Sequence, residues 1–241
     1  MTFTRKRVEW LVVIVAFICI TCALTLLAFK FHQLKDAQSY FDNLDEALKF
    51  PTQVKVLILR NQPIDSLPEA IGELENIRVL NLANNHLKAL PESIGNLRNL
   101  EALSVDNNEL SKLPISMVNL KRLKIVNLSG NHFRALPLEL LTLDSLGKLN
   151  LSNNQIEKVD FIGLGAIEEL DLSENGITEL PSVVYNLQHL KKLDLYKNKI
   201  KAVPGNLFDL PLLNEVILSE NPLDEPSQVR YSNFLNRRVI K

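Results

Sequence analysis

One pattern of leucines recurs through most of this chain at a nearly constant spacing. The stretch from Ile77 to Leu97 reads L-x-x-L-x-L-x-x-N-x-L-x-x-L-P-x-x-I-x-x-L, and the next copy starts at Leu100. Successive copies are roughly 23 residues apart. Eight copies start at Val54, Ile77, Leu100, Leu123, Leu146, Ile167, Leu190 and Leu213. A period of this length predicts a solenoid, in which each coil packs against its neighbours.

Each repeat contains two different hydrophobic periods. The L-x-L part alternates with a period of two, which predicts a short strand with one face turned inward. The I-x-x-L-x-x-L part has a period of three to four, which predicts a helical or 3₁₀ turn. One repeat cannot bury its own leucines, so we expect stacked repeats to bury those of their neighbours.

Two polar or rigid columns run through the repeats beside the leucines. An asparagine follows each strand in most copies: Asn85, Asn108, Asn131, Asn154, Asn175, Asn198 and Asn221. Because an amide both donates and accepts, we expect this column to satisfy the backbone groups freed where the strand turns away. A proline marks the entry to most convex segments: Pro68, Pro91, Pro114, Pro137, Pro181 and Pro204.

These motifs resemble the leucine-rich repeat family over residues 54–223. The L-P-x-x-I-x-x-L half is similar to the subclass found in Ras-binding-type, plant intracellular and many bacterial repeat proteins, and the lead-in at 44–51 looks most like bacterial members. The resemblance implies an α/β fold: a right-handed, curved solenoid of about eight repeats with a parallel sheet on its concave face. It also implies that the concave face binds another protein.

The chain divides into five segments. Residues 1–9 are a basic N-terminal segment, and 10–29 are predicted to form a transmembrane signal-anchor helix. Residues 30–53 are a juxtamembrane linker and an N-terminal capping helix, and 54–223 are the repeats. Residues 224–241 are a C-terminal cap helix and a basic tail.

The membrane prediction rests on an uncharged run from Trp10 to Phe29, which is long enough as a helix to span a bilayer. A cleaved signal peptide and a buried helix are the alternatives, but the run is long for the first and lacks a good cleavage site. A slight excess of basic residues before the run favours a single-pass protein with its repeats on the non-cytosolic, periplasmic or extracellular side. Both cysteines, Cys19 and Cys22, lie in this run, so the repeats carry none of the cysteine-rich caps of extracellular animal and plant relatives.

Both ends of the solenoid are predicted to be covered. Residues 36–50 read as a short helix with Ser39 as its N-cap. Its apolar face comprises Phe41, Leu44 and Leu48. A second helix is expected from Pro226, and the side chains that would close the last repeat are Tyr231, Phe234 and Leu235.

The fifth repeat, which starts at Leu146, is two residues short and lacks the Leu-Pro pair. Because its strand half is intact, the missing length must come from the convex side. Gly163 and Gly165 would permit a tighter convex loop there.

Three rows of side chains flank the inward leucines on the concave face. The first row is Ile58, Asn81, Ser104, Asn127, Asn150, Asp171, Asp194 and Ile217. The second row is Arg60, Ala83, Asp106, Ser129, Ser152, Ser173, Tyr196 and Ser219. The third row contains Lys148, Glu169, Lys192 and Glu215. Neighbours in a row should lie about 4.8 Å apart, so the alternating charges of the third row predict a self-neutralising ladder.

The residues that carry most enzyme chemistry are not brought together by this frame. His86 and His132 are two repeats apart and too few for a zinc site. The serines have no histidine beside them as a base, and the chain has no Gly-rich phosphate loop. With a net charge of −1, the chain has no overall field for nucleic acid. We therefore expect no catalysis, cofactor, metal, nucleic acid or small-molecule substrate.

The sequence thus favours a membrane-anchored module that binds another protein. The concave residues predicted to receive this partner are Asp106, Asn127, Asn150, Asp171, Asp194 and Tyr196. Tyr196 is the expected anchor, because aromatic side chains with a polar tip dominate binding hot spots. The alternative is a stiff, self-associating protein that organises a cell envelope without a discrete ligand. A third hypothesis, an enzyme, has no motif in its favour.

Overall fold

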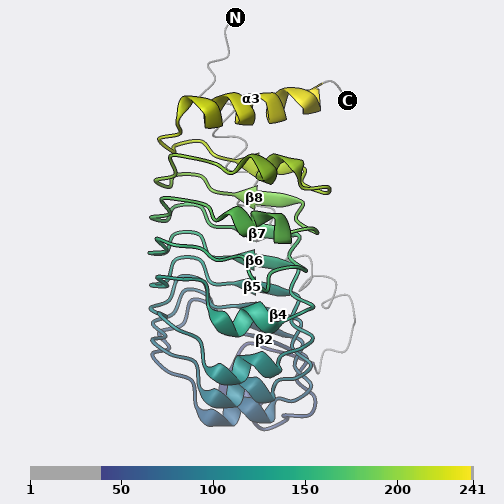
Figure 1. Ribbon diagram of the computed structural model, residues 1–241. Coiled ribbons are helices and arrows are strands. Elements are labelled where there is room, and N and C mark those ends of the chain that lie inside the picture. Colours follow the sequence, from purple (N-terminus) through teal and green to yellow (C-terminus); the bar gives the residue numbers. More distant parts are fainter. Residues whose placement is uncertain (1–38, 240–241) are drawn as a thin grey trace, which may run out of the picture.

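The computed structural model describes residues 39–239, which form a stack of coils with one parallel sheet (Figure 1). Within this part of the chain the sheet has nine strands in sequence order, with consecutive strands hydrogen-bonded to each other. They are β1 (Tyr40–Phe41), β2 (Val56–Ile58), β3 (Val79–Asn81), β4 (Ala102–Ser104), β5 (Ile125–Asn127), β6 (Lys148–Asn150), β7 (Glu169–Asp171), β8 (Lys192–Asp194) and β9 (Glu215–Ile217).

Short 3₁₀ helices form the opposite, convex side of most coils. They are η1 (Glu69–Glu73), η2 (Glu92–Asn96), η3 (Ile115–Asn119), η4 (Leu138–Thr142), η5 (Ser182–Asn186) and η6 (Gly205–Asp209). The residue before each is the column proline, as at Pro91, whose φ of −69° and ψ of 153° end the preceding extended segment. Proline has no N–H to lose at this position, so it marks the entry to the turn without cost to hydrogen bonding.

The inward leucines of neighbouring strands lie directly beside one another. The central residues in register are Leu57, Leu80, Leu103, Val126, Leu149, Leu170, Leu193 and Val216. Each is at most 3% exposed, and all belong to one continuous core. The predicted stacking of leucines is confirmed, and since full burial of an aliphatic side chain contributes roughly 1.5–3 kcal/mol, this column is a main source of stability.

The asparagine column bonds each coil to the one before it. In the fourth repeat, Asn131 Nδ2 donates to the carbonyl of Val105, in the third repeat, at 3.0 Å and to that of Leu128 at 3.1 Å. Its Oδ1 accepts the N–H of Leu110 at 2.9 Å, also from the third repeat. The other six members repeat this pattern, so the prediction that amides satisfy the corner backbone is confirmed.

The short fifth repeat loses its length on the convex side, as expected. The strand β6 is intact, whereas no 3₁₀ helix lies between η4 and η5 in the described chain. Gly163 adopts a φ of +87°, and a Cβ at this position would lie 2.5 Å from the carbonyl oxygen of Leu141. Only glycine fits both constraints, so the tighter loop depends on it.

The N-terminal cover differs from the prediction in its details. Residues 40–41 form β1, which pairs with β2, and the helix is limited to α2 (Leu44–Ala47). Its N-cap is Asn43, whose Oδ1 accepts the N–H of Glu46, so the prediction of Ser39 as the cap was wrong. Strand pairing at the sheet edge holds this segment extended where the sequence pattern favoured helix. The side chains expected to cover the first repeat, Phe41, Leu44 and Leu48, do pack on the core.

The C-terminal cover is α3 (Glu225–Val239), which lies across the last coil (Figure 1, yellow). Phe234 is buried, and Tyr231 packs on the same core while its hydroxyl donates to the carbonyl of Val216. Leu235 is 43% exposed, so the expectation that it also closes the last repeat was wrong.

The predicted transmembrane helix at residues 10–29 lies outside the described residues. Among residues 39–239, none of the helices combines the length and hydropathy that a membrane span requires.

Replacing Asn131 by alanine should lower the free energy of unfolding by about 2–4 kcal/mol, because it leaves the buried Leu110 N–H and Val105 carbonyl without this partner. Urea unfolding of the full chain measures the change. Asn119→Ala, at an exposed position on η3, serves as the control. Equal stabilities for the two variants would contradict the role of the amide column.

Candidate functional site

The concave face carries the three predicted rows of side chains. Register pairs the first row across β2 to β9, so that Asn127 lies opposite Asn150, and Asp171 opposite Asp194. The backbone of the second row is bonded in the same order: Asn84 donates to the carbonyl of Asp106. The predicted neighbours therefore lie side by side on one continuous surface.

The Asn and Asp residues of the first row are bound to their own backbone. In each of them a side-chain oxygen accepts the N–H of the residue two positions on, as in Asn150 Oδ1 with the N–H of Ser152 at 2.8 Å. The other members with this bond are Asn81, Asn127, Asp171 and Asp194. This is an Asx turn, in which Asn and Asp are interchangeable because only one oxygen is required. The first row thus shapes the exit of each strand, which the sequence analysis did not predict.

The second row is more accessible than the first. Asp106 and Tyr196 are partly exposed, whereas Asn127 is only 3% exposed and Asn150 7%. Burial raises the pKa of Asp106, and the Ser104 hydroxyl, which donates to its Oδ1, opposes that rise. A partner would therefore meet the side chains of the second row before those of the first.

The third row has two different halves. Its C-terminal half is the predicted charge ladder, in which Lys148 Nζ lies 2.5 Å from Glu169 Oε1 and Lys192 Nζ lies 3.0 Å from a carboxylate oxygen of Glu215. Its N-terminal half is a buried apolar cluster that the sequence analysis missed: Val56, Val79, Ala102 and Ile125. The alternation of the strands contained this signal, because these residues occupy the same position in earlier repeats as Lys148 does in the fifth.

Two carboxylates lie side by side near the C-terminal end of the face. Asp171 and Asp194 are register partners on β7 and β8. Burial, followed by the charge of Asp171, raises the pKa of Asp194 to about 7, while Lys192 opposes the rise. Burial also raises the pKa of Asp171, which Ser173 opposes by donating to its Oδ1. The pair therefore holds a proton well above the usual range of an aspartate.

Within residues 39–239, no group of three or more His, Cys, Asp or Glu side chains could hold a metal ion. The structure places all six predicted site residues on the concave face. They lie on or just after the strands β4 to β8: Asp106, Asn127, Asn150, Asp171, Asp194 and Tyr196. That these residues bind a protein stays a prediction.

Two family models match the sequence and together span the coils described above. A model described as "Leucine-rich repeat region" matches residues 25–159, and one described as "Leucine rich repeat" matches residues 167–223. The unmatched residues 160–166 coincide with the short convex turn of the fifth repeat. No curated protein matches the chain.

Several solved structures have a similar fold. An internalin C2 from Listeria monocytogenes is 25% identical with a TM-score of 0.66, covering 78% of this chain and 80% of its own. An internalin, inlF, from the same organism is 22% identical with a TM-score of 0.58, and the match covers 74% of this chain and 58% of that one. A TDR receptor is 22% identical with a TM-score of 0.64, over 73% of this chain and 32% of its own. The two likenesses at 22% establish the fold alone.

The raised pKa of Asp194 predicts a specific pH dependence of stability. Unfolding releases its proton between about pH 4 and pH 7, so its contribution to stability falls as pH rises through this window and is constant above it. Asp194→Asn keeps the Asx turn but has no carboxyl group to titrate at this position. The free energy of unfolding of the variant minus that of the wild type should therefore increase by roughly 2–3 kcal/mol between pH 5 and pH 8.

Urea unfolding at both pH values measures this difference. Asp144→Asn, at an exposed position, should leave the pH dependence of the wild type unchanged. If the stability of Asp194→Asn follows the wild-type pH dependence as closely as that of Asp144→Asn does, the pKa of Asp194 is not raised beside Asp171.

Proposed function

We propose, since this chain belongs to the leucine-rich repeat family, that it is a module which binds another protein on its concave face. The fold commonly mediates recognition between proteins. The observation that carries the proposal is the continuity of the concave face, where strands in chain order present the same rows without interruption. Such a surface suits an extended contact with a large partner.

The distribution of exposure favours the second row as the contact surface. The apolar half of the third row is already buried, so a partner would gain little by covering it. Much of the charged half is paired within the chain, which leaves fewer unpaired charges to attract a partner. Tyr196, in the second row, is accessible, and its ring and hydroxyl can make both apolar and polar contacts.

Tyr196 is held in place before any partner arrives. Its backbone N–H donates to Asp194 Oδ1 at 2.9 Å, and its carbonyl accepts the N–H of Glu174 at 2.8 Å. These bonds fix its backbone, and an aromatic side chain has few rotatable bonds to order on binding, which is a property of hot-spot residues. We therefore assign Tyr196 as the anchor at one end of a contact surface that extends along the strands to β4. The other residues of this surface are Asp106, Asn127, Asn150, Asp171 and Asp194.

We further propose that residues 10–29 anchor this module in a membrane, with the repeats on the non-cytosolic side. The support is the uncharged run itself, its length and the basic residues that precede it. A stiff solenoid tethered at one end would present its concave face at a fixed region near the membrane surface. Catalysis forms no part of the proposal.

Proximity labelling from an enzyme fused to the C-terminus tests the partner and the membrane side together. Tyr196→Ala should remove at least one neighbour from the labelled proteins, and should weaken the affinity of the purified neighbour roughly 10- to 30-fold. Tyr185→Ala is the matched control, because Tyr185 is 53% exposed on the convex helix η5.

Three outcomes would count against these proposals. Identical labelled sets for the two tyrosine variants would remove Tyr196 as the anchor. A set limited to copies of this chain would favour the self-associating envelope protein. Labelling of cytosolic proteins alone would contradict the proposed topology.

A further inference from the structure

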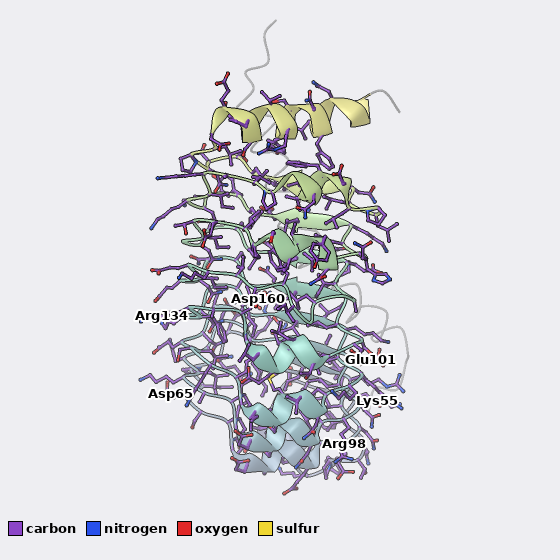
Figure 2. The ribbon with its side chains drawn as sticks, in the orientation of Figure 1. Lys55, Asp65, Arg98, Glu101, Arg134 and Asp160 are labelled. Carbon is purple, nitrogen blue, oxygen red and sulfur yellow. The ribbon has the colours of Figure 1, made fainter. Side chains whose placement is uncertain are left out.

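A hollow opens on the side of the solenoid, between the exits of the strands and the convex turns. It has a volume of about 570 Å³ and is lined by Ser111, His132, Arg134 and Gln155, which come from three successive repeats. Figure 2 shows Arg134 projecting from this edge of the stack, with Asp65, its counterpart three repeats earlier, below it. The short Ser111 creates the space, because its position is held by Lys88 in the preceding repeat and by Arg134 in the following one.

The lining side chains are rich in hydrogen-bond donors. Arg134 offers a guanidinium, and Ser111 a hydroxyl. Gln155 Nε2 lies 3.4 Å from His132 Nδ1, and with the amide as donor the imidazole carries its proton on Nε2, where it can donate in turn. None of the four lining residues is acidic. A group that meets all of them must accept several hydrogen bonds and carry negative charge.

Two carboxylates occupy neighbouring positions on this side of the coils, and neither lines the hollow. Glu109, which lies between His86 and His132 in the stack, places Oε1 3.9 Å from His86 Nδ1. Glu157 follows Arg134 in the next repeat, and its Cγ lies 3.5 Å from the place where a Cβ on Gly176 would be. It forms no ion pair with Arg134 in the part of the chain that the structure describes.

Arg134 is consequently left without a counter-charge. Its guanidinium makes no ion pair or hydrogen bond with any residue in 39–239. Lys197 shows the contrast, because its Nζ lies 2.8 Å from Glu174 Oε2 on the neighbouring coil. An arginine without an acid, beside three further donors, has the composition of an oxyanion-binding site.

We propose that this hollow binds a tetrahedral oxyanion, the phosphate or sulfate group of a small polar molecule. Arg134 supplies the charge and paired N–H donors, and Ser111, His132 and Gln155 complete the shell from two sides. The volume exceeds that of a bare phosphate and suits a small ester, with the remainder of the ligand in the open mouth. The site lies apart from the concave face and does not depend on the proposed protein-binding function.

Isothermal titration of the full chain with inorganic phosphate, sulfate and acetate, at constant ionic strength, tests the assignment. Phosphate and sulfate should bind with dissociation constants near the millimolar range, as expected for an open site, and acetate more weakly. Arg134→Gln should weaken phosphate binding about tenfold or more, because a charge-assisted hydrogen-bond pair is lost. Lys201→Gln removes a charge from the equivalent position three repeats later and should leave binding unchanged.

The proposal is overturned if phosphate does not bind, or if both variants weaken it equally, which would indicate a diffuse charge effect. Tighter binding of acetate than of phosphate would overturn the tetrahedral assignment. Ser111→Lys provides a second test, because it restores the lysine found in the second repeat and should fill the hollow. Undiminished phosphate binding by a folded Ser111→Lys variant would place the site elsewhere.

Discussion

Each coil of this solenoid is stable because its neighbours cover its leucines. A single repeat has no interior, so every inward side chain of the central column is buried by residues from the coils on either side. The same dependence explains the asparagine column, since the backbone groups that turn away from the sheet at each corner bind an amide of the adjacent coil. It also explains why both ends carry covers, with α2 at one end and α3 at the other. These covers use side chains such as Phe234 to shield a coil that has no further neighbour.

Because the buried leucines and the asparagine column hold the coils together, the outward rows of side chains can differ between coils. Where the first row forms an Asx turn it must supply one oxygen, and both Asn150 and Asp171 satisfy that requirement. A change from amide to carboxylate therefore alters the charge without altering the shape of the turn, which is how the half-buried Asp171 and the buried Asp194 come to lie together at β7 and β8. The side loops also differ from repeat to repeat. Ser111 stands where the preceding repeat has Lys88, and this shorter side chain opens the hollow beside Arg134. A repeated frame with variable edges can thus carry several surfaces, each defined by a few positions.

The sequence predicted the parts of the structure that follow from the period. The buried leucine column, the asparagine bonds, the short convex turn and the Lys148–Glu169 ladder all depend on residue type and spacing. It failed at the N-terminal end, where β1 pairs with the sheet and Asn43 caps the helix, because the edge of a sheet competes with local helical preference. It also failed to predict the side hollow, because the side-chain contacts around it, such as Gln155 with His132 and Glu109 with His86, form only in the folded stack. The sequence does contain the pattern behind the Asx turns, an Asn or Asp two residues before a Ser, as in Asn150 and Ser152. Its structural role became clear only from the hydrogen bonds in the folded chain.

Neighbouring coils stabilise one another through the buried column, and a comparison of the unfolding free energies of Leu149→Ala and Ile115→Ala in the full chain tests this. Leu149 is 1% exposed in the middle of the sheet, whereas Ile115 is 73% exposed on the convex side. We expect the free energy of unfolding to fall by roughly 2–5 kcal/mol for the first substitution and by less than about 0.5 kcal/mol for the second, because only the first leaves a cavity between coils. Similar small losses for both would contradict it.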